Sequence, residues 1–352
     1  MNMKNSHSEP TNKYSILFTI VFIGLLVYSG LNGIKNGPAE LEQNFPFREQ
    51  LITMITEFRL ILGDRVFQQA LIGNDGWLEL TSGGNLDDYQ NAVPMSPGNF
   101  EKLQTSLQDF YEELNTRNIT LLIVIAPNKG TIYPEKLPTE IQKIQQDSRM
   151  DTLLTYNTEH EPMVFIDLRP ILLEAKRTQQ IYYQTDTHWN AIGAYYAYKS
   201  IIDELSLSFP DLQARALTDF TQSVSAPGQR DISRLMSASS LLESFPLLTP
   251  NFVVNTKWTT LNKDIIPAVI SAQPNTTLPR AMIYHDSFGE SLRPFLSLNF
   301  SEAIFIHRNS GQKDLAGYGF VDLFSPDIII IEIVERDLSS LRSLLENFIQ
   351  SK

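Results

Sequence analysis

The order of apolar and polar positions predicts strands and helices that alternate along the last two thirds of the chain. Residues 120–126 form an unbroken apolar run, which is typical of a strand buried on both faces of a sheet. Further strands are predicted at 164–168, 280–284, 303–306 and 328–333, and helices at 191–205 and 338–349. Strands separated by helices indicate a mainly parallel sheet with helices on both faces, so the predicted fold class is α/β.

The chain before residue 99 follows another pattern. Apolar positions at helical spacing predict a helix near residues 51–61, and Asp75-Gly76 is a turn dipeptide inside a predicted strand–turn–strand at 73–78. A loop rich in Gly, Asn, Asp and Pro follows at 82–99. We therefore assign residues 35–98 to an N-terminal elaboration or tether, and residues 99–352 to one α/β domain.

The N-terminal region contains a run without charged residues, from Tyr14 to Ile34. As a helix it would measure roughly 30 Å, which is enough to cross a bilayer once. It predicts a transmembrane signal-anchor at 14–34 after a cytoplasmic tail at 1–13, with a cleaved signal peptide as the alternative. The flanking lysines and arginines favour an N-terminus inside and a main body outside.

Composition narrows the possible chemistry. The chain has no cysteine, which excludes a disulfide framework, a thiolate metal site and a cysteine nucleophile. The formal net charge is −12, so no basic stripe is expected that would bind the phosphates of a nucleic acid. No cofactor motif is found, and none is expected.

One segment that carries chemistry is Tyr183-Gln-Thr-Asp-Thr-His-Trp-Asn190, just before a predicted helix. In an extended segment, residues two apart point the same way, so Asp186 and His188 are expected to share a side. The carboxylate can then accept a hydrogen bond from the imidazole and fix its tautomer. Asn190 is the expected N-cap of the following helix. A surface turn is the alternative interpretation of such an Asp-x-His pair.

The other such segment is Ala281-Met-Ile-Tyr-His-Asp-Ser-Phe-Gly-Glu290, where a predicted strand leads into Ser287 and the start of a helix. This geometry exposes a nucleophile and places free helical N–H groups beside its hydroxyl, where they can stabilise an oxyanion. Gly289 would let the backbone approach closely. Asp186, His188 and Ser287 therefore form a candidate triad at the ends of parallel strands, where sites gather in such sheets.

Two further residues have alternative interpretations. Trp189 is expected either to stack on a sugar ring or, preferably, to act as a packing anchor at the start of a helix. Lys129, at the end of the strand at 120–126, would either contact an anionic substrate or lie in a solvated turn.

These motifs resemble a known family. Asp186-Thr-His-Trp-Asn190 and Asp286-Ser-Phe-Gly289 are similar to the SGNH hydrolase-like domain of the AlgJ/AlgX-type alginate O-acetyltransferases. Further segments follow in the family's order: Phe45-Pro-Phe-Arg48, Gly73-Asn-Asp-Gly-Trp77, Ile132-Tyr-Pro-Glu135, Pro326-Asp327 and Glu335-Arg336. The resemblance implies an SGNH-like (flavodoxin-like) fold that is circularly permuted, because the Asp/His block precedes the serine block.

The resemblance also implies roles and partners. Ser287 would be the nucleophile, His188 the general base and acid, and Asp186 its orienting residue. The implied reaction moves acetyl groups onto a secreted polysaccharide such as alginate through an acyl-serine intermediate. The implied partners are the polysaccharide acceptor and a multispanning membrane acyltransferase as acetyl donor. The implied location is the periplasmic side of a bacterial inner membrane, with a single membrane pass.

The oxyanion hole departs from the usual SGNH pattern. After the strand that ends near residue 306, Asn309-Ser-Gly311 offers a backbone N–H, but no Gly-x-Asn-Asp block follows the strand at 328–333. His285 also replaces the glycine of the usual Gly-Asp-Ser. Gly289, Asn309 and Gly311 are therefore the candidates for the oxyanion hole.

Other function classes remain open at this stage. An acetylesterase would use the same triad with water as acceptor. A metal-dependent hydrolase would use Asp186 and His188 with His285 and Asp286 as ligands. A silent polysaccharide-binding scaffold would retain the fold without turnover.

Overall fold

The computed structural model describes residues 11–36, 48–159, 164–261, 268–310, 315 and 317–350. The chain divides into two compact units, Met1–Gly63 and Asp64–Lys352, and each is described by itself. The predicted division of the chain at residues 13, 34 and 98 stays a prediction.

The N-terminal unit contains two helices, α1 (Thr11–Asn36) and α3 (Arg48–Ile61). Helix α1 covers the run without charged residues. Within the part of the chain that the structure describes, no helix is both long and apolar enough to cross a membrane. The transmembrane anchor predicted at 14–34 is therefore not confirmed.

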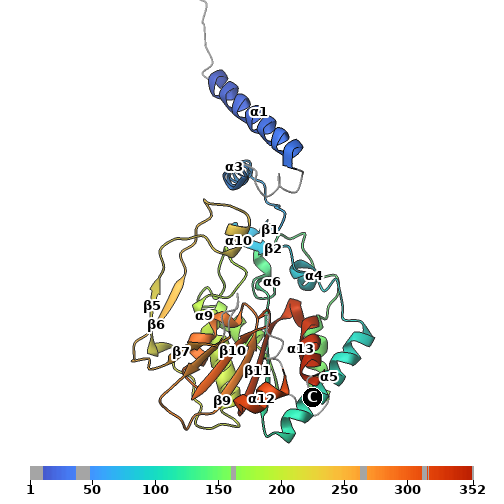
Figure 1. Ribbon diagram of the computed structural model, residues 1–352, viewed down its shortest axis with the longest axis vertical. Coiled ribbons are helices and arrows are strands. Elements are labelled where there is room, and N and C mark those ends of the chain that lie inside the picture. Colours follow the sequence, from blue (N-terminus) through green and yellow to red (C-terminus); the bar gives the residue numbers. More distant parts are fainter. Residues whose placement is uncertain are drawn as a thin grey trace, which may run out of the picture. The chain divides into compact units, whose positions relative to one another are not determined.

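The second unit is built around a seven-stranded sheet with the strand order β4-β3-β11-β9-β10-β8-β7 (Figure 1). Neighbouring strands from β4 to β10 are parallel, whereas β8 and β7 are antiparallel to their neighbours. The strands of this sheet are β3 (Thr120–Ala126), β4 (Val164–Asp167), β7 (Lys257–Thr260), β8 (Val269–Ala272), β9 (Arg280–His285), β10 (Glu302–His307) and β11 (Ile328–Val334).

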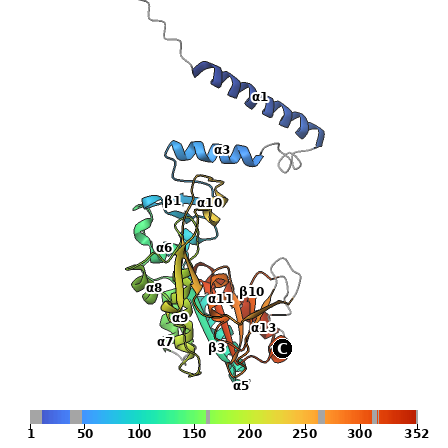
Figure 2. The ribbon, with the colours of Figure 1, turned by 90° about the vertical axis from the view of Figure 1, so that its left-hand side faces the viewer.

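Helices cover both faces of this sheet (Figures 1 and 2). A hydrophobic core lies between the sheet and the helices on each face. One core contains apolar side chains of α8 (Arg169–Lys176), α9 (Ala191–Leu205) and α11 (Arg293–Leu296). The other contains those of α5 (Pro97–Thr116), α7 (Arg149–Glu159), α12 (Tyr318–Phe324) and α13 (Leu338–Gln350). Burial on both faces explains why the parallel strands are apolar throughout rather than alternating. The predicted α/β class and mainly parallel sheet are therefore confirmed.

Small elements complete the unit. Strands β1 (Ala70–Ile72) and β2 (Leu78–Leu80) pair in antiparallel fashion around Asp75, whose φ of 54° lies in the left-handed region. This confirms the predicted strand–turn–strand. A second ribbon, β5 (Phe220–Val224) with β6 (Pro246–Pro250), and the edge strands β7 and β8 were not predicted. The short helices are α4 (Asn85–Tyr89), α6 (Lys129–Ile132) and α10 (Asp231–Leu235).

The carboxyl ends of the parallel strands meet at one edge of the sheet. In the aligned register, the last residue of β3 pairs with the last residue of β11, and His285 at the end of β9 pairs with His307 at the end of β10. The segments that follow these strands therefore lie close together, as expected for a site in an open parallel sheet.

Candidate active site

Asp186, His188 and Ser287 form a continuous hydrogen-bonded series. His188 Nδ1 lies 2.7 Å from Asp186 Oδ1, and His188 Nε2 lies 2.8 Å from Ser287 Oγ. The acid is buried, the imidazole is partly exposed and the serine is exposed. The structure thus brings together three residues that the sequence places up to 101 positions apart, from Asp186 to Ser287.

The loop that carries Asp186 and His188 is a tight turn rather than an extended strand. It is closed by an antiparallel bridge between Tyr182 and Trp189 and by a 3.2 Å bond from the Tyr183 N–H to the His188 carbonyl. Asp186 Oδ1 accepts both the backbone N–H of His188, at 3.0 Å, and its ring. The expectation that the two side chains share a side is met, but by this turn and not by strand alternation.

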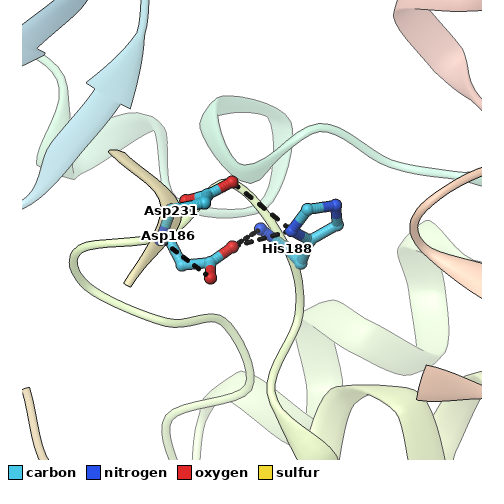
Figure 3. A group of neighbouring side chains, drawn as sticks. All are labelled: Asp186, His188 and Asp231. Atoms are coloured by element: carbon cyan, nitrogen blue, oxygen red, sulfur yellow. Dashed lines mark hydrogen bonds and ion pairs between the residues drawn. The ribbon is translucent and has the colours of Figure 1, made fainter. Parts of the chain in front are cut away.

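A second acid, Asp231, approaches His188 from the start of α10 (Figure 3). Its Oδ2 lies 3.6 Å from His188 Nδ1, and its backbone N–H points to Asp186 Oδ2 at 3.4 Å. Burial and the charge of Asp186 raise the pKa of Asp231 to about 6. Sequence analysis missed this residue because its contact with the Asp-x-His segment spans 45 positions and no local pattern indicates it.

Asp186 is held in its charged form. Burial opposes ionisation, but the hydrogen bonds from His188 and the charge of its ring outweigh burial and hold the pKa of Asp186 well below its usual range. The Arg230 guanidinium adds a positive charge 3.4 Å from Asp186 Oδ2 and stacks on Tyr183 and Phe245. An ionised carboxylate at this point can orient and stabilise an imidazolium.

Lys129 binds backbone carbonyls of the loop that carries Asp186 and His188, and of β2. It is buried, and its ammonium donates to the carbonyls of Leu78 and of Asp186, the latter at 2.6 Å. Both earlier interpretations of Lys129, a substrate contact and a solvated turn, differ from this arrangement. Glu243 holds the other side of the loop, accepting the N–H groups of Gln184 at 2.7 Å and Thr185 at 2.8 Å.

Trp189 is a packing anchor. It is fully buried, meets the Phe288 ring edge-on at 5.1 Å, and its indole N–H donates to the Phe288 carbonyl at 3.2 Å. It therefore ties the His188 loop to the Ser287 turn and has no surface for a sugar ring. Asn190 caps α9 by accepting the N–H groups of Ile192 and Gly193, as predicted.

Two backbone N–H groups of the serine turn bond to buried acids. Asp286 Oδ1 accepts the Phe288 N–H at 2.8 Å, and Glu332 Oε2 accepts the Asp286 N–H at 3.1 Å. A side chain at Gly289 would place Cβ 2.4 Å from the Cβ of His285, so this position requires glycine for close packing. The N–H of Ser287 itself has no partner among the described residues.

The remaining oxyanion candidates are Asn309 and Gly311. Asn309 contacts neither Ser287 nor His188 in the described structure, and its backbone N–H donates to His307 Nδ1 at 3.1 Å. Gly311 lies outside the described residues. Their predicted oxyanion roles stay predictions.

His285 and Asp286, two of the metal ligands in the alternative hypothesis, make other contacts in the structure. His285 donates from Nδ1 to the Asp286 carbonyl at 2.6 Å, and its Nε2 faces the Arg293 guanidinium, so burial and that charge lower its pKa to about 3. Both oxygens of Asp286 accept backbone N–H groups. Among the described residues, Asp186, His188 and Asp231 form a group whose possible metal-ligand atoms all lie within 4.8 Å of one another.

The chain is similar to proteins of a known family. The family description "SGNH hydrolase-like domain, acetyltransferase AlgX" matches residues 70–264, which is more than half of the chain. The chain belongs to this AlgX-type SGNH hydrolase-like family. A relative by sequence is the "Probable alginate O-acetylase AlgJ" of Pseudomonas aeruginosa, 28% identical over 124 residues. That match covers 35% of this chain and 30% of the relative, so the chain spans less than a third of that protein.

Solved structures share the fold. A DHHW family protein from Eubacterium siraeum superposes with a TM-score of 0.57 at 14% identity, covering 80% of this chain and 96% of that one. Bacillus cereus PatB1 gives a TM-score of 0.54 at 17% identity, covering 76% and 96%. The O-acetyltransferase domain of Pseudomonas putida AlgJ gives 0.51 at 17% identity, covering 77% and 92%. At these identities the likeness concerns the fold alone.

Proposed function

We propose that this protein is an O-acetyltransferase that moves acetyl groups onto a polysaccharide through an acyl-serine intermediate. The proposal is carried by one observation, the series of 2.7 and 2.8 Å contacts that leads from the buried Asp186 through His188 to the exposed Ser287. Membership of a family described by an acetyltransferase agrees with it. The proposal includes the permuted order of the SGNH blocks, with Asp186 and His188 before Ser287.

In the first half-reaction, Ser287 Oγ attacks the carbonyl carbon of an acetyl ester or thioester. His188 Nε2 takes the hydroxyl proton, and Asp186 stabilises the imidazolium through Nδ1–H. The carbonyl oxygen becomes an oxyanion, for which the unpartnered N–H of Ser287 is the proposed donor. When the carbonyl re-forms, the leaving group takes the proton from His188 and acetyl-Ser287 remains.

In the second half-reaction, a sugar hydroxyl gives its proton to His188 and attacks acetyl-Ser287. The acetylated sugar leaves, and the proton on His188 returns to Ser287 Oγ. The relative AlgJ is described as an alginate O-acetylase, and we propose an exopolysaccharide acceptor of that class for this chain. We further propose that a multispanning membrane acyltransferase supplies the acetyl groups.

An acetylesterase with the same triad is the nearest alternative, because water can replace the sugar at the same step. A metal-dependent hydrolase is a second alternative, and the specific observation behind it is the Asp186–His188–Asp231 group. A binding scaffold without turnover is a third. The first experiment must separate all of these.

We would assay the full chain for acetate release from an activated acetyl ester, with and without oligosaccharide acceptors. Ser287→Ala and His188→Ala test the triad, and Ser208→Ala, at an exposed serine after α9, is the matched control. We expect both triad variants to fall to background and the control to retain the parent rate. Mass spectrometry should find an acetyl group on the peptide that contains Ser287.

The outcomes distinguish the alternatives. A mass gain on the oligosaccharide supports the transferase, whereas acetate alone supports the esterase. Loss of activity on chelation, without inactivation by a serine-directed phosphonate, would favour the metal hydrolase. A folded but inert parent that binds glycan would favour the scaffold.

A further inference from the structure

A buried acid outside the triad holds the serine turn. Glu332 lies in β11, which is paired on both sides within the sheet; it is 2% exposed and accepts the Asp286 N–H at 3.1 Å through Oε2. Asp286 immediately precedes Ser287, so the Glu332 side chain holds the backbone next to the nucleophile.

A second buried acid meets Glu332 at this turn. Asp286 and Glu332 are both 2% exposed, and the backbone N–H of Asp286 donates to the Glu332 carboxyl group, so two buried acids adjoin each other. Two buried carboxylates repel each other, and a hydrogen bond between them requires a proton on one of them. The pair must therefore hold one proton between two acids.

The surroundings of the two acids decide which one holds the proton. Asp286 Oδ1 accepts the Phe288 N–H and Oδ2 accepts the Val334 N–H, both at 2.8 Å, and such bonds stabilise a charged carboxylate. Glu332 Oε1 is buried and has no conventional hydrogen-bond donor in the described structure. Burial and the charge of Asp286 raise the pKa of Glu332 well above its usual range.

Arg308 lines the same cavity as Glu332, but its guanidinium already pairs with Asp337 at 2.6 Å. Strand β3 contributes Val124, which pairs with Glu332 in the sheet register. Strand β9 contributes His285, whose burial and nearby Arg293 keep it neutral with a pKa of about 3. The phenol of Tyr182 also lies within electrostatic range, and burial raises its pKa well above its usual value.

We propose that Glu332 is a neutral carboxylic acid in the working protein, and that the proton it shares with Asp286 fixes the Ser287 turn in its reactive geometry. Glu332 is thus a positioning residue that acts through the turn and touches no substrate. This inference rests on the proposed function of Ser287 as the nucleophile. It adds that the nucleophile is positioned by an acid pair with one proton rather than by an ion pair.

The sharpest test compares Glu332→Gln with Glu332→Leu in the full chain. A glutamine amide can donate to Asp286 as the protonated acid does and can still accept the Asp286 backbone N–H, so we expect kcat near that of the parent. Leucine can do neither, and displacement of a nucleophile by about 1 Å can cost on the order of 100-fold in rate. We expect that loss in kcat with KM unchanged. Glu302→Gln is the control, because it removes an acid of β10 that pairs with Arg280 of β9.

Infrared spectroscopy tests the proton without reference to activity. We expect a carbonyl band of a protonated acid at neutral pH in the parent and in Glu302→Gln, and its loss in Glu332→Gln. Absence of the band in the parent, or a Glu332→Gln variant as slow as Glu332→Leu, would overturn the proposal. If a phosphonate fails to label Ser287 in the parent, the proposed function fails and the positioning role with it, while the band still decides where the proton lies.

Discussion

Removal of Asp186 should show that His188 has two carboxylate partners. Asp186→Asn replaces the acceptor 2.7 Å from Nδ1 with a neutral amide, but Asp231 Oδ2 remains 3.6 Å away. With an effective dielectric constant near 20, a unit charge on the imidazolium is stabilised by about 6 kcal/mol at the shorter distance and about 5 kcal/mol at the longer one. Asp231 therefore retains most of the electrostatic stabilisation when it is ionised.

Expected rates follow from that comparison. In triads with a single acid, replacement by asparagine costs about 10⁴-fold in kcat. Here we expect a loss of about 10²-fold for Asp186→Asn, about threefold for Asp231→Asn and about 10⁴-fold for the double variant, because neighbouring residues that substitute for each other are non-additive. Hydrolysis of an activated acetyl ester at pH 8 measures this, since Asp231, with a pKa of about 6, is ionised there.

The refuting results are specific. If Asp186→Asn is already as slow as the double variant, Asp231 does not act on His188. If Asp186→Asn retains the parent kcat, the imidazole is not oriented by Asp186 at all. Asp322→Asn, at an exposed acid paired with Arg117, controls for the loss of one negative charge.

Three further predictions concern the supporting residues. Trp189→Phe removes the hydrogen bond to the Phe288 carbonyl and some buried volume, so thermal unfolding should show a loss of about 1–3 kcal/mol in the free energy of unfolding. An increase in KM for an oligosaccharide without that loss of stability would favour the sugar-stacking interpretation instead. Lys129→Met leaves buried carbonyls unpaired and should lower the free energy of unfolding in urea by at least about 2 kcal/mol, whereas Lys199→Met at an exposed pair should change it little. Above pH 4.5, the ordinary pKa of glutamate, Glu332 loses its proton in the unfolded chain but keeps it in the folded protein. Glu332 should therefore lower the free energy of unfolding of the parent by about 1.4 kcal/mol per pH unit, until the pH reaches its pKa in the folded protein. Urea titrations from pH 5 to 7 should find this contribution absent in Glu332→Gln, and equal slopes for both proteins would contradict it.

Much of the fold could be predicted from the sequence because buried parallel strands are locally distinctive. The apolar runs that became β3, β9 and β11 have few charged residues, since both faces of each strand are covered. Strand β7 was missed because all four of its residues are exposed at the edge of the sheet, where no apolar pattern is needed.

The candidate triad was predictable for a similar reason. Asp186 and His188 are two residues apart, and Ser287 follows a recognisable strand, so each half of the site has a local pattern. Asp231 has none, and only the packing of α10 against the loop brings its carboxylate to the imidazole. The change of interpretation for Lys129 has the same origin, because its burial depends on a carbonyl contributed by β2.

The sequence by itself determined the order of the elements, the α/β class and the residues able to act as acid, base and nucleophile. Those properties depend on side-chain type and on periodicity, which a linear sequence contains. Only the tertiary structure decided how the site is held: by Lys129 and Glu243 on the histidine loop, by Trp189 between the two halves, and by Glu332 and Asp286 beneath the serine. Hydrogen bonds between distant segments and the protonation of buried acids depend on which groups meet out of water, and packing alone determines that.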